Sequence, residues 1–235
     1  MQFEPPLQPA TLIRRYKRFL SDIRLDDGQE VAAHCANPGA MTGLAEPGSR
    51  IWVQDVRHRG GKMPFSWKLN DLGSGQFAAI DTSLPNRLVK EALAAQSISD
   101  LPAYDAVRPE QPYAQNSRID FLLDGPGGQT FLEVKNMHLM RRDGLAEFPD
   151  SVTARGAKHL RALAEVAENG GRAVMLYVIQ RTDCTAASLA ADIDPGYVAA
   201  YRDAAAAGVQ TLALTTRISP QGIELGGALP FLAPD

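Results

Sequence analysis

Hydrophobic and polar residues alternate in short runs over the first 80 positions, and turn sequences separate the runs. This pattern is typical of β-strands with one buried face. Asp26-Asp27-Gly28 is a strong hairpin signal after the first run. Five strands are expected, at Thr11–Leu25, Glu30–Cys35, Arg50–Val56, Phe65–Leu69 and Gln76–Asp81. Five short strands in this length indicate a small closed or partly open barrel such as an OB-fold.

From residue 82 the pattern becomes a mixture of helix and strand. Leu84, Leu88 and Ala92 recur at helical spacing behind Ser83, a residue type that caps helices. The predicted order is a helix to about Ala95, strands at Tyr104–Pro112, Ser117–Asp124 and Gln129–Lys135, a helix at Ser151–Glu168, a buried strand at Arg172–Gln180, a helix at Gly196–Ala207, a strand at Val209–Thr215 and a short last strand. We therefore expect an α/β (α+β) protein with domains at residues 1–80 and 81–235.

Composition places the chain among ordinary globular proteins. Of its 235 residues, 45% are hydrophobic and 22% are charged, which excludes disordered and collagen-like chains. The longest apolar run, Ala173–Ile179, is far shorter than the ~20 residues that cross a bilayer, so no membrane association is expected. The first residues lack the pattern of a secretory signal, which favours a cytoplasmic location. Two distant cysteines, Cys35 and Cys184, support neither a disulfide framework nor a zinc site.

Basic residues gather in two clusters, although the net charge is −3. The clusters are Arg14, Arg15, Lys17 and Arg18, and then Arg57, His58, Arg59 and Lys62. Residues 1–80 hold 10 basic and 8 acidic side chains, against 14 and 19 in residues 81–235. Local clusters of this kind can contact phosphates on a mildly acidic protein. The alternative is a solvated surface, which is common for such runs.

The candidate chemistry lies in a predicted hairpin around Gly125-Pro126-Gly127-Gly128. If these residues form the turn, Asp124 pairs with Gln129, and the register places Asp120 opposite Glu133. Two carboxylates so close repel each other unless a positive charge lies between them. Mg²⁺ or Mn²⁺ is the expected occupant, because hard cations prefer oxygen ligands.

Lys135 shares a strand face with Glu133 and is expected to position a water molecule or to offset phosphate charge. Asp120 and Glu133 would then hold the metal of a phosphodiesterase site. Glu91, on the preceding helix, is a candidate fourth member, although it could instead pair with Arg87.

Several alternatives remain open for these residues. A salt-bridge ladder could join Lys135 to Asp120 and Arg118 to Glu133, without any metal. Arg155, Lys158 and His159 share one helix face that could hold a phosphodiester backbone or simply be solvated. Asp150 is interpreted as a charge at a helix N-terminus. The other three histidines are interpreted as structural or surface residues.

Five segments together resemble one bacterial family, the sugar fermentation stimulation (SfsA) proteins. They are PATLIRRYKRFL at Pro9–Leu20, HCANPGAMTG at His34–Gly43, SRIDFLL at Ser117–Leu123, EVKN at Glu133–Asn136, and FPDSVTARGAKHL at Phe148–Leu160. The resemblance covers nearly the whole chain. It implies an N-terminal OB-like domain, a C-terminal restriction-endonuclease-like domain and DNA binding without marked sequence preference.

Carried over to this chain, the nuclease-like signature falls on Asp120, Glu133 and Lys135, with Glu91 as the fourth candidate. Two segments depart from the family pattern, Ser66–Leu69 and Met137-His138. Neither departure changes the carboxylates or the lysine. Arg118, Arg155 and Lys158 are then expected to hold the phosphate.

Two functions follow as competing hypotheses. The first is a DNA-binding protein with a divalent-metal nuclease site. The second is a non-catalytic DNA-binding regulator that affects sugar fermentation genes. A small-molecule enzyme has no support, since the chain lacks a phosphate-binding glycine loop and a nucleophile–His–acid arrangement. The sequence leaves open whether DNA or RNA is the partner, and which oligomeric state the protein adopts.

Overall fold

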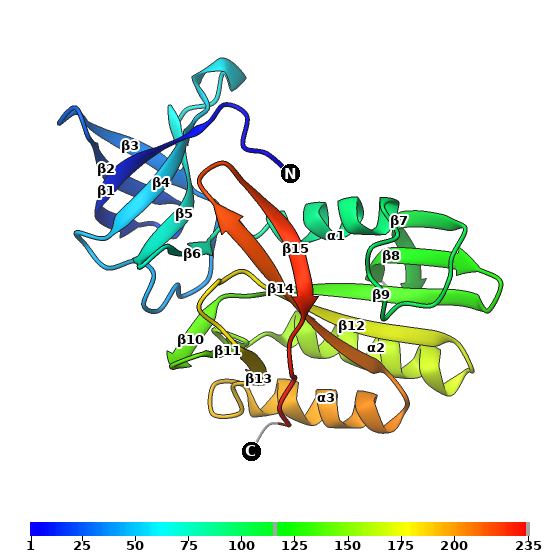
Figure 1. Cartoon of the computed structure of the whole chain (residues 1–235). Helices are drawn as coiled ribbons and strands as arrows, with labels where there is room; N and C mark the ends of the chain where they lie inside the picture. Colours follow the sequence, from blue (N-terminus) through cyan, green and yellow to red (C-terminus); the bar gives the residue numbers. More distant parts are fainter. Residues whose placement is uncertain (115–116, 234–235) are drawn as a thin grey trace.

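The computed structural model describes residues 1–114 and 117–233, which form a β-barrel followed by a larger mixed α/β half (Figure 1). The barrel half contains β1 (Leu7–Tyr16), β2 (Leu20–Leu25), β3 (Glu30–Cys35), β4 (Arg50–Asp55), β5 (Phe65–Gly73) and β6 (Gln76–Ala79). β1 pairs with both β2 and β4, and β3 pairs in parallel with β5, so the first five strands close into a barrel. The OB-fold prediction is confirmed.

The predicted strand Thr11–Leu25 is in fact a hairpin of two strands, so the half has six strands instead of five. The turn lies at Lys17 and Arg18, whose φ angles are 47° and 64°. Positive φ is uncommon for residues other than glycine, so a run of aromatic and basic residues gives no sign of a turn. The basic cluster therefore lies on a turn and not along one strand.

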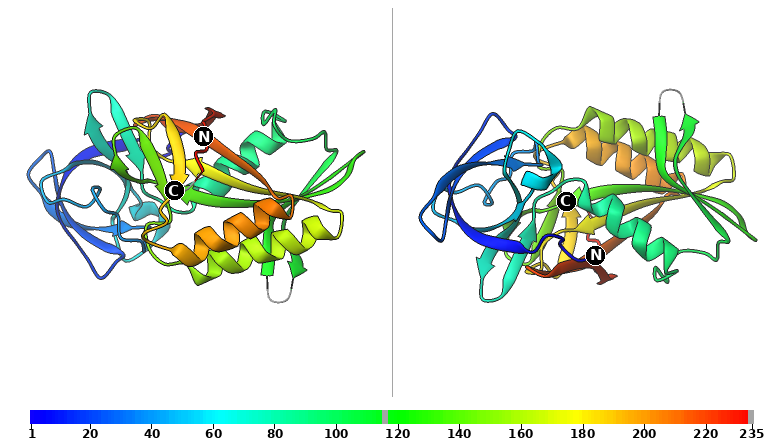
Figure 2. Two further views of the ribbon diagram at one scale, coloured as in Figure 1. Left: turned by 90° about the horizontal axis from the view of Figure 1, so that it is seen from below. Right: turned by 90° about the horizontal axis from the view of Figure 1, so that it is seen from above.

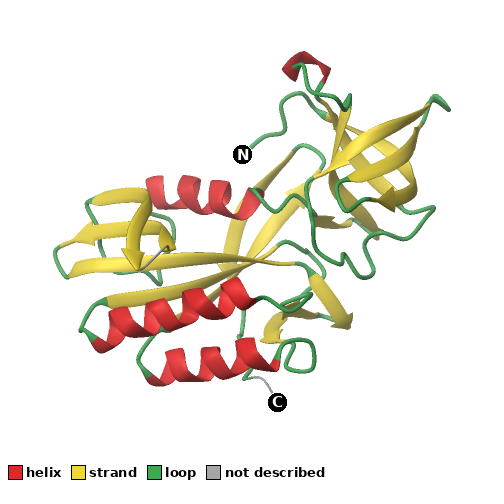
Figure 3. Cartoon of the chain, turned by 180° about the vertical axis from the view of Figure 1, so that it is seen from behind, coloured by secondary structure: helices red, strands yellow, loops and turns green. Residues whose placement is uncertain are grey.

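The second half begins with α1 (Leu84–Ala94) and continues through β7 (Ala106–Ala114), β8 (Ser117–Gly125), β9 (Gly128–Met137), α2 (Ala154–Glu168), β12 (Arg172–Ile179), α3 (Pro195–Ala206), β14 (Gln210–Ser219) and β15 (Gly222–Ala228). Its main sheet has the order β15-β14-β12-β9-β8-β7, with β9, β12 and β14 parallel. α1 covers one face of this sheet, while α2 and α3 cover the other (Figures 2 and 3). The predicted order of helix, three strands, helix and strand is confirmed.

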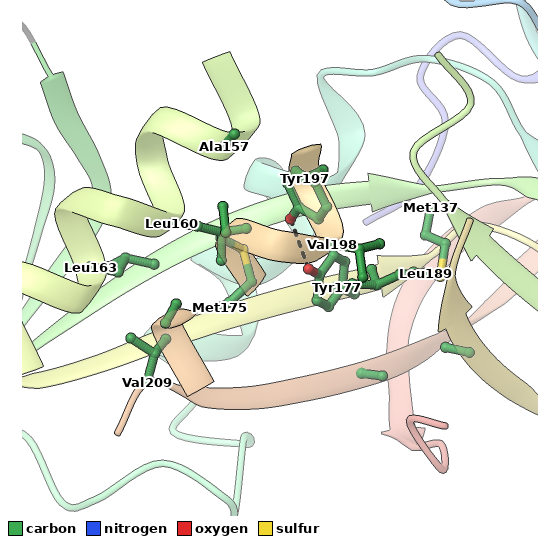
Figure 4. Close-up of a cluster of buried hydrophobic side chains, with 14 of the residues drawn as sticks. Met137, Ala157, Leu160, Leu163, Met175, Tyr177, Leu189, Tyr197, Val198 and Val209 are labelled. Carbon is green, nitrogen blue, oxygen red and sulfur yellow. Dashed lines mark hydrogen bonds between the residues drawn. The ribbon is translucent and has the colours of Figure 1, made fainter. Parts of the chain in front are cut away.

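β12 lies at the centre of this sheet and is buried on both faces. Met175 and Tyr177 pack toward α2 and α3, whereas Val174 and Leu176 belong to the cluster beneath α1. The hydroxyls of Tyr177 and Tyr197 lie 2.7 Å apart, which satisfies two polar groups inside the apolar core (Figure 4). A continuous apolar run is what a strand covered by helices on both faces requires.

A small second sheet was not predicted. It consists of β10 (Leu139–Arg142), β11 (Leu145–Phe148) and β13 (Ala186–Leu189), in the order β10-β11-β13. Each strand has only four residues. Four residues are too few to show a clear alternation of apolar and polar positions, so the sequence carried no usable signal.

Backbone and side-chain contacts join the two halves. The Ala79 amide donates to the Gln180 carbonyl at 2.9 Å. This bond joins the last residue of β6 to the residue that directly follows β12 in the second half. In a second contact, the Ala40 amide donates to Asp150 Oδ2 at 3.1 Å. A Cβ atom on Gly39 would lie 2.2 Å from that oxygen, so a larger residue there would displace the Asp150 carboxylate. Asp150 thus binds the loop after β3 and does not cap α2, whose N-cap is Thr153. This corrects the sequence interpretation.

Across the described helices, none is both long enough and apolar enough to span a bilayer.

Candidate metal and nucleic-acid site

The hairpin of β8 and β9 has the predicted register. Asp124 pairs with Gln129, and the ladder runs on as far as Phe121 and Leu132. At the next position the ladder ends, and Asp120 Oδ2 accepts a 2.8 Å hydrogen bond from the Val134 amide. The side chain of Asp120 therefore takes the place of a backbone partner where the two strands separate.

Asp120 is a half-buried carboxylate without a cationic hydrogen-bond partner among the described residues. Its second oxygen, Oδ1, accepts a 2.7 Å hydrogen bond from Asn86 Nδ2 on α1. Burial raises the pKa of Asp120, and the nearby charge of Glu133 raises it further. The hydrogen bond from Val134 opposes these effects but does not outweigh them. An added positive charge at this point would therefore stabilise the ionised form.

Glu133 is 2% exposed and carries a different set of contacts. Its Oε1 accepts from Lys135 Nζ at 2.5 Å and from His159 Nδ1. Its Oε2 is buried and has no hydrogen-bond partner within the described part of the chain. Burial acts to raise the pKa of Glu133, but His159 and Lys135 outweigh it and hold the pKa below its ordinary value. Glu133 is thus an ionised carboxylate with one oxygen unused.

His159 connects this carboxylate to α2. The Arg155 guanidinium donates to His159 Nε2 at 3.4 Å, so Nδ1 carries the proton that Glu133 accepts. The two side chains lie one helical turn apart, at i and i+4. His159 is buried, in contrast to the solvated face that the sequence left open.

These residues line one cleft of about 860 Å³ between the hairpin, α1 and the start of α2. The predicted site residues that line it are Arg118, Asp120, Glu133, Lys135, Arg155 and Lys158. Four cationic side chains therefore surround two carboxylates. The alternative salt-bridge ladder is not formed, because Lys135 bonds Glu133 instead of Asp120.

Glu91 does not belong to this cleft, which corrects the prediction of a fourth member. It pairs with the N-terminal amine of Met1 at 3.0 Å and lines a separate cavity with residues of β15. The helix was predicted correctly, but its contribution to the cleft comes from Asn86, five residues earlier. An asparagine in a first helical turn is usually a local hydrogen-bonding residue, so the sequence gave no reason to single it out.

The basic clusters of the barrel serve partly to hold the barrel itself together. Arg14 pairs with Asp22 at 2.7 Å, and Arg57 pairs with Asp55 at 2.5 Å. Arg15 donates to the carbonyls of Arg18, Asn37 and Gly39, and Arg18 donates to that of Pro38. Lys17 is exposed on the turn, and Arg59 and Lys62 line a cavity on the barrel. The cationic surface of the barrel is therefore smaller than the seven arginines and lysines of the two clusters suggest.

The donor set near Asp120 is consistent with a divalent cation that keeps several waters. Within the described residues no group of three or more His, Cys, Asp or Glu is arranged to hold a metal. Two carboxylates suffice for Mg²⁺-type sites, in which water completes the shell. Glu133 Oε2 is the atom that fits this role, because it is ionised, buried and without a partner.

The topology and the cleft define a class of protein: an OB barrel joined to a restriction-endonuclease-like domain. Comparison with known families agrees with both parts. The SfsA N-terminal OB domain matches residues 13–80, and the sugar fermentation stimulation protein RE domain matches residues 83–222. The chain belongs to the SfsA family.

Relatives match along the whole chain. A sugar fermentation stimulation protein homolog of Ruegeria pomeroyi is 57% identical over 230 residues, covering 97% of this chain and 100% of the relative. A homolog of Allorhizobium ampelinum is 50% identical, covering 95% of each chain. Among solved structures, Pyrococcus furiosus SfsA in complex with Ca²⁺ matches with a TM-score of 0.88 and 24% identity, covering 99% of this chain and 98% of that one. This last likeness shows the fold.

Proposed function

We propose that this protein binds DNA without sequence preference and hydrolyses phosphodiester bonds in the cleft, with a divalent cation at Asp120 and Glu133. The observation that carries the proposal is the unused, buried Oε2 of ionised Glu133 beside a carboxylate whose pKa is raised. Leaving a buried charged oxygen without a partner is costly, so such an atom indicates a missing ligand.

The ligand chemistry supports Mg²⁺ or Mn²⁺. Both donors are carboxylate oxygens, which suit hard cations. A structurally similar SfsA protein, from Pyrococcus furiosus, is described in complex with Ca²⁺, another cation of this type. When bound, such a cation would neutralise charge on the phosphoryl oxygens and lower the pKa of a bound water.

The protein's own residues prepare the cleft for this chemistry. Asn86 and the Val134 amide fix both oxygens of Asp120. Lys135 and His159 together hold Oε1 of Glu133, which orients Oε2. Preorganised charges of this kind need no rearrangement during the reaction.

Cationic side chains supply the DNA contacts. Arg118, Arg155 and Lys158 line the cleft around the carboxylates. Contacts from Arg and Lys to phosphate oxygens fix a nucleic acid in place but do not read its bases. Binding is therefore expected to be sequence-independent and to weaken steeply as salt is added.

A plasmid-nicking assay tests the proposal. Purified protein is incubated with supercoiled plasmid and Mg²⁺ or Mn²⁺, with EDTA as the blank. We expect metal-dependent nicking that Glu133→Gln abolishes, because the substitution removes the charge of Oε2. Glu147→Gln is the matched control, since Glu147 is an equally buried glutamate outside the cleft. Nicking by the Glu133→Gln variant at the wild-type rate would contradict the proposed site.

The second candidate is a non-catalytic DNA-binding protein. One observation favours it: Oε1 of Glu133 already accepts hydrogen bonds from the Lys135 ammonium and from His159, which reduces the need of Glu133 for a metal. In that case no divalent cation would produce nicking. The gel-shift affinity for DNA would remain, and Asp120→Asn would leave it unchanged or strengthen it by removing a negative charge.

A further inference from the structure

A second cavity, of about 690 Å³, opens on the barrel away from the carboxylates. One wall is the β1–β2 turn with Phe19, and the opposite wall is the β4–β5 loop with Arg59, Lys62 and Met63. The end of β3 lies between them. In OB-folds, the face of strands 2 and 3 and the loops between strands 1–2 and 4–5 bind oligonucleotides. The cavity therefore occupies a position suited to a nucleic-acid strand.

Phe19 is the feature of this cavity that most needs an explanation. Its side chain is 46% exposed, and it is the only aromatic among the large hydrophobic residues exposed in the described chain. Its ring stacks on His34, with centroids 6.4 Å apart and planes inclined by 10°. Its backbone is fixed, since the Phe19 carbonyl accepts from the Cys35 amide at 2.9 Å. The result is a rigid, flat apolar surface held open to solvent.

The charges around this surface favour a polyanion. Arg59 and Lys62 line the cavity on the loop side. Deeper in, Lys68 and Asp81 pair at 2.6 Å, so their charges cancel. Neither Arg59 nor Lys62 forms an ion pair with an acid in the part of the chain that the structure describes. A flat apolar ring beside such cations matches a nucleotide, which combines a flat base with a phosphate. Bases inside a duplex are stacked on each other, so only an unpaired base can reach the ring.

The helix α1 connects this cavity to the cleft. Ser83, directly before α1, lines the barrel cavity, and Asn86, in the first turn of α1, lines the cleft. Three helical residues span about 5 Å along the axis, which is less than the length of one extended nucleotide. The two cavities therefore adjoin the same end of α1.

We propose that this cavity is a subsite for single-stranded nucleic acid, in which an unpaired base stacks on Phe19 while Arg59 and Lys62 contact its phosphates. The inference rests on the proposed binding of nucleic acid and adds a preference for unpaired strands. It also gives the barrel its own role, namely to hold one strand beside the carboxylate cleft.

Fluorescence anisotropy tests the subsite directly. A labelled thymidine oligonucleotide of about 12 nucleotides is compared with an abasic phosphodiester of equal length, in EDTA so that no cleavage occurs. Both probes carry the same charge, and only the first can stack. We expect wild type to prefer the oligonucleotide with bases. Phe19→Ala should weaken that binding about 5- to 150-fold and remove the difference between the probes.

Two variants serve as controls. Leu232→Ala truncates a similarly exposed apolar side chain, 47% exposed, outside both cavities, and should leave binding unchanged. Phe19→Trp keeps an aromatic surface, so it should retain binding, and its added indole fluorescence should be quenched when thymidines stack on it. Lys62→Ala should weaken the binding of both probes equally. It should also make the slope of log affinity against log salt less steep by about 0.7, because one phosphate contact is lost.

The outcomes separate the inference from the proposed function. Equal binding of both probes by wild type, or unchanged binding by Phe19→Ala, overturns the subsite, even if plasmid is still nicked through Glu133. Absence of binding to any DNA, single- or double-stranded, overturns the subsite and the proposed function together. Absence of nicking with intact, Phe19-dependent binding overturns the catalytic proposal alone.

Discussion

The cleft and the small sheet each bury a glutamate, and the two glutamates are satisfied differently. Glu133 and Glu147 are 2% and 3% exposed. Arg141 donates from Nη2 to Glu147 Oε1 at 2.8 Å and from Nε to Oε2 at 2.9 Å, so both oxygens have partners. In Glu133 both partners converge on Oε1, and Oε2 has none within the described residues.

The difference teaches how a structural carboxylate can be told from a functional one. A bidentate arginine completes a carboxylate geometrically and leaves no room for a ligand. A lysine ammonium and a histidine N–H that both donate to one oxygen stabilise the negative charge but leave a coordination position open on the other oxygen. Glu133 and Glu147 are similarly buried, and each has a cationic partner. They differ in how many of their carboxylate oxygens accept a hydrogen bond, which is one in Glu133 and two in Glu147.

The largest expected effect is a divalent-cation response that depends on the glutamate replaced. Mn²⁺ at about 100 times its dissociation constant should stabilise wild type by about 2.7 kcal/mol, because it binds only the folded state. Glu133→Gln should abolish this gain, and Glu147→Gln should keep it. Thermal melts with and without Mn²⁺ provide the measurement. An equal response in both variants would remove the distinction between the two glutamates.

The next effect concerns stability without metal. Glu147→Gln should destabilise the fold by about 1–3 kcal/mol, since the amide cannot accept both hydrogen bonds from Arg141. Urea unfolding in EDTA measures the change. Glu133→Gln should cost less, because its amide oxygen can still serve the one acceptor position in use. A greater loss in Glu133→Gln would show that Glu133 is the structural residue.

A smaller change in stability is expected from Asp120→Asn, and this substitution should stabilise the protein. The folded state raises the pKa of Asp120, so the unfolded chain ionises more readily and the native state is penalised at neutral pH. The asparagine removes that penalty. Its amide oxygen can still accept from the Val134 amide, and its NH2 can donate to Asn86 once the Asn86 amide turns over, so no hydrogen bond is lost. The melting temperature in EDTA should therefore rise at pH 7. The gain should vanish as pH falls below about 4, the pKa of an unfolded aspartate, where both states are protonated. A lower melting temperature at pH 7 would contradict this explanation.

The smallest effect is expected at the outer edge of the small sheet. Asp192 is exposed and also binds Arg141, at 2.6 Å. Exposed ion pairs contribute little, so Asp192→Asn should shift the melting temperature less than any substitution above. Differential scanning calorimetry can resolve the ranking. A shift as large as that of Glu147→Gln would mean that Arg141 depends on both acids equally.

The sequence was sufficient for the parts of the site that local rules determine. The glycine-rich turn at 125–128 sets the hairpin register, and the register brings Asp120 next to Glu133. The same reasoning fails for contacts between elements. Asn86 and His159 reach the carboxylates from two helices, and their positions follow from how α1 and α2 pack on the sheet. Neither packing angle can be read from a run of residues.

Charge clusters were the least reliable signal. The run from Arg14 to Arg18 reads as a phosphate-binding surface, yet three of its four cations bind Asp22 or backbone carbonyls of the barrel. A sequence records how many charges occur but not which ones fold against a partner. Phe19, directly after the run, was missed because one exposed aromatic residue has no pattern.

The most direct measurement is a crystal of the protein soaked in Mn²⁺, examined by anomalous diffraction. The account predicts one strong peak within coordination distance of Glu133 Oε2 and an Asp120 oxygen, and no peak at Glu147. A cleft without a peak, at Mn²⁺ concentrations that support nicking, would contradict it. So would a peak located only at other residues.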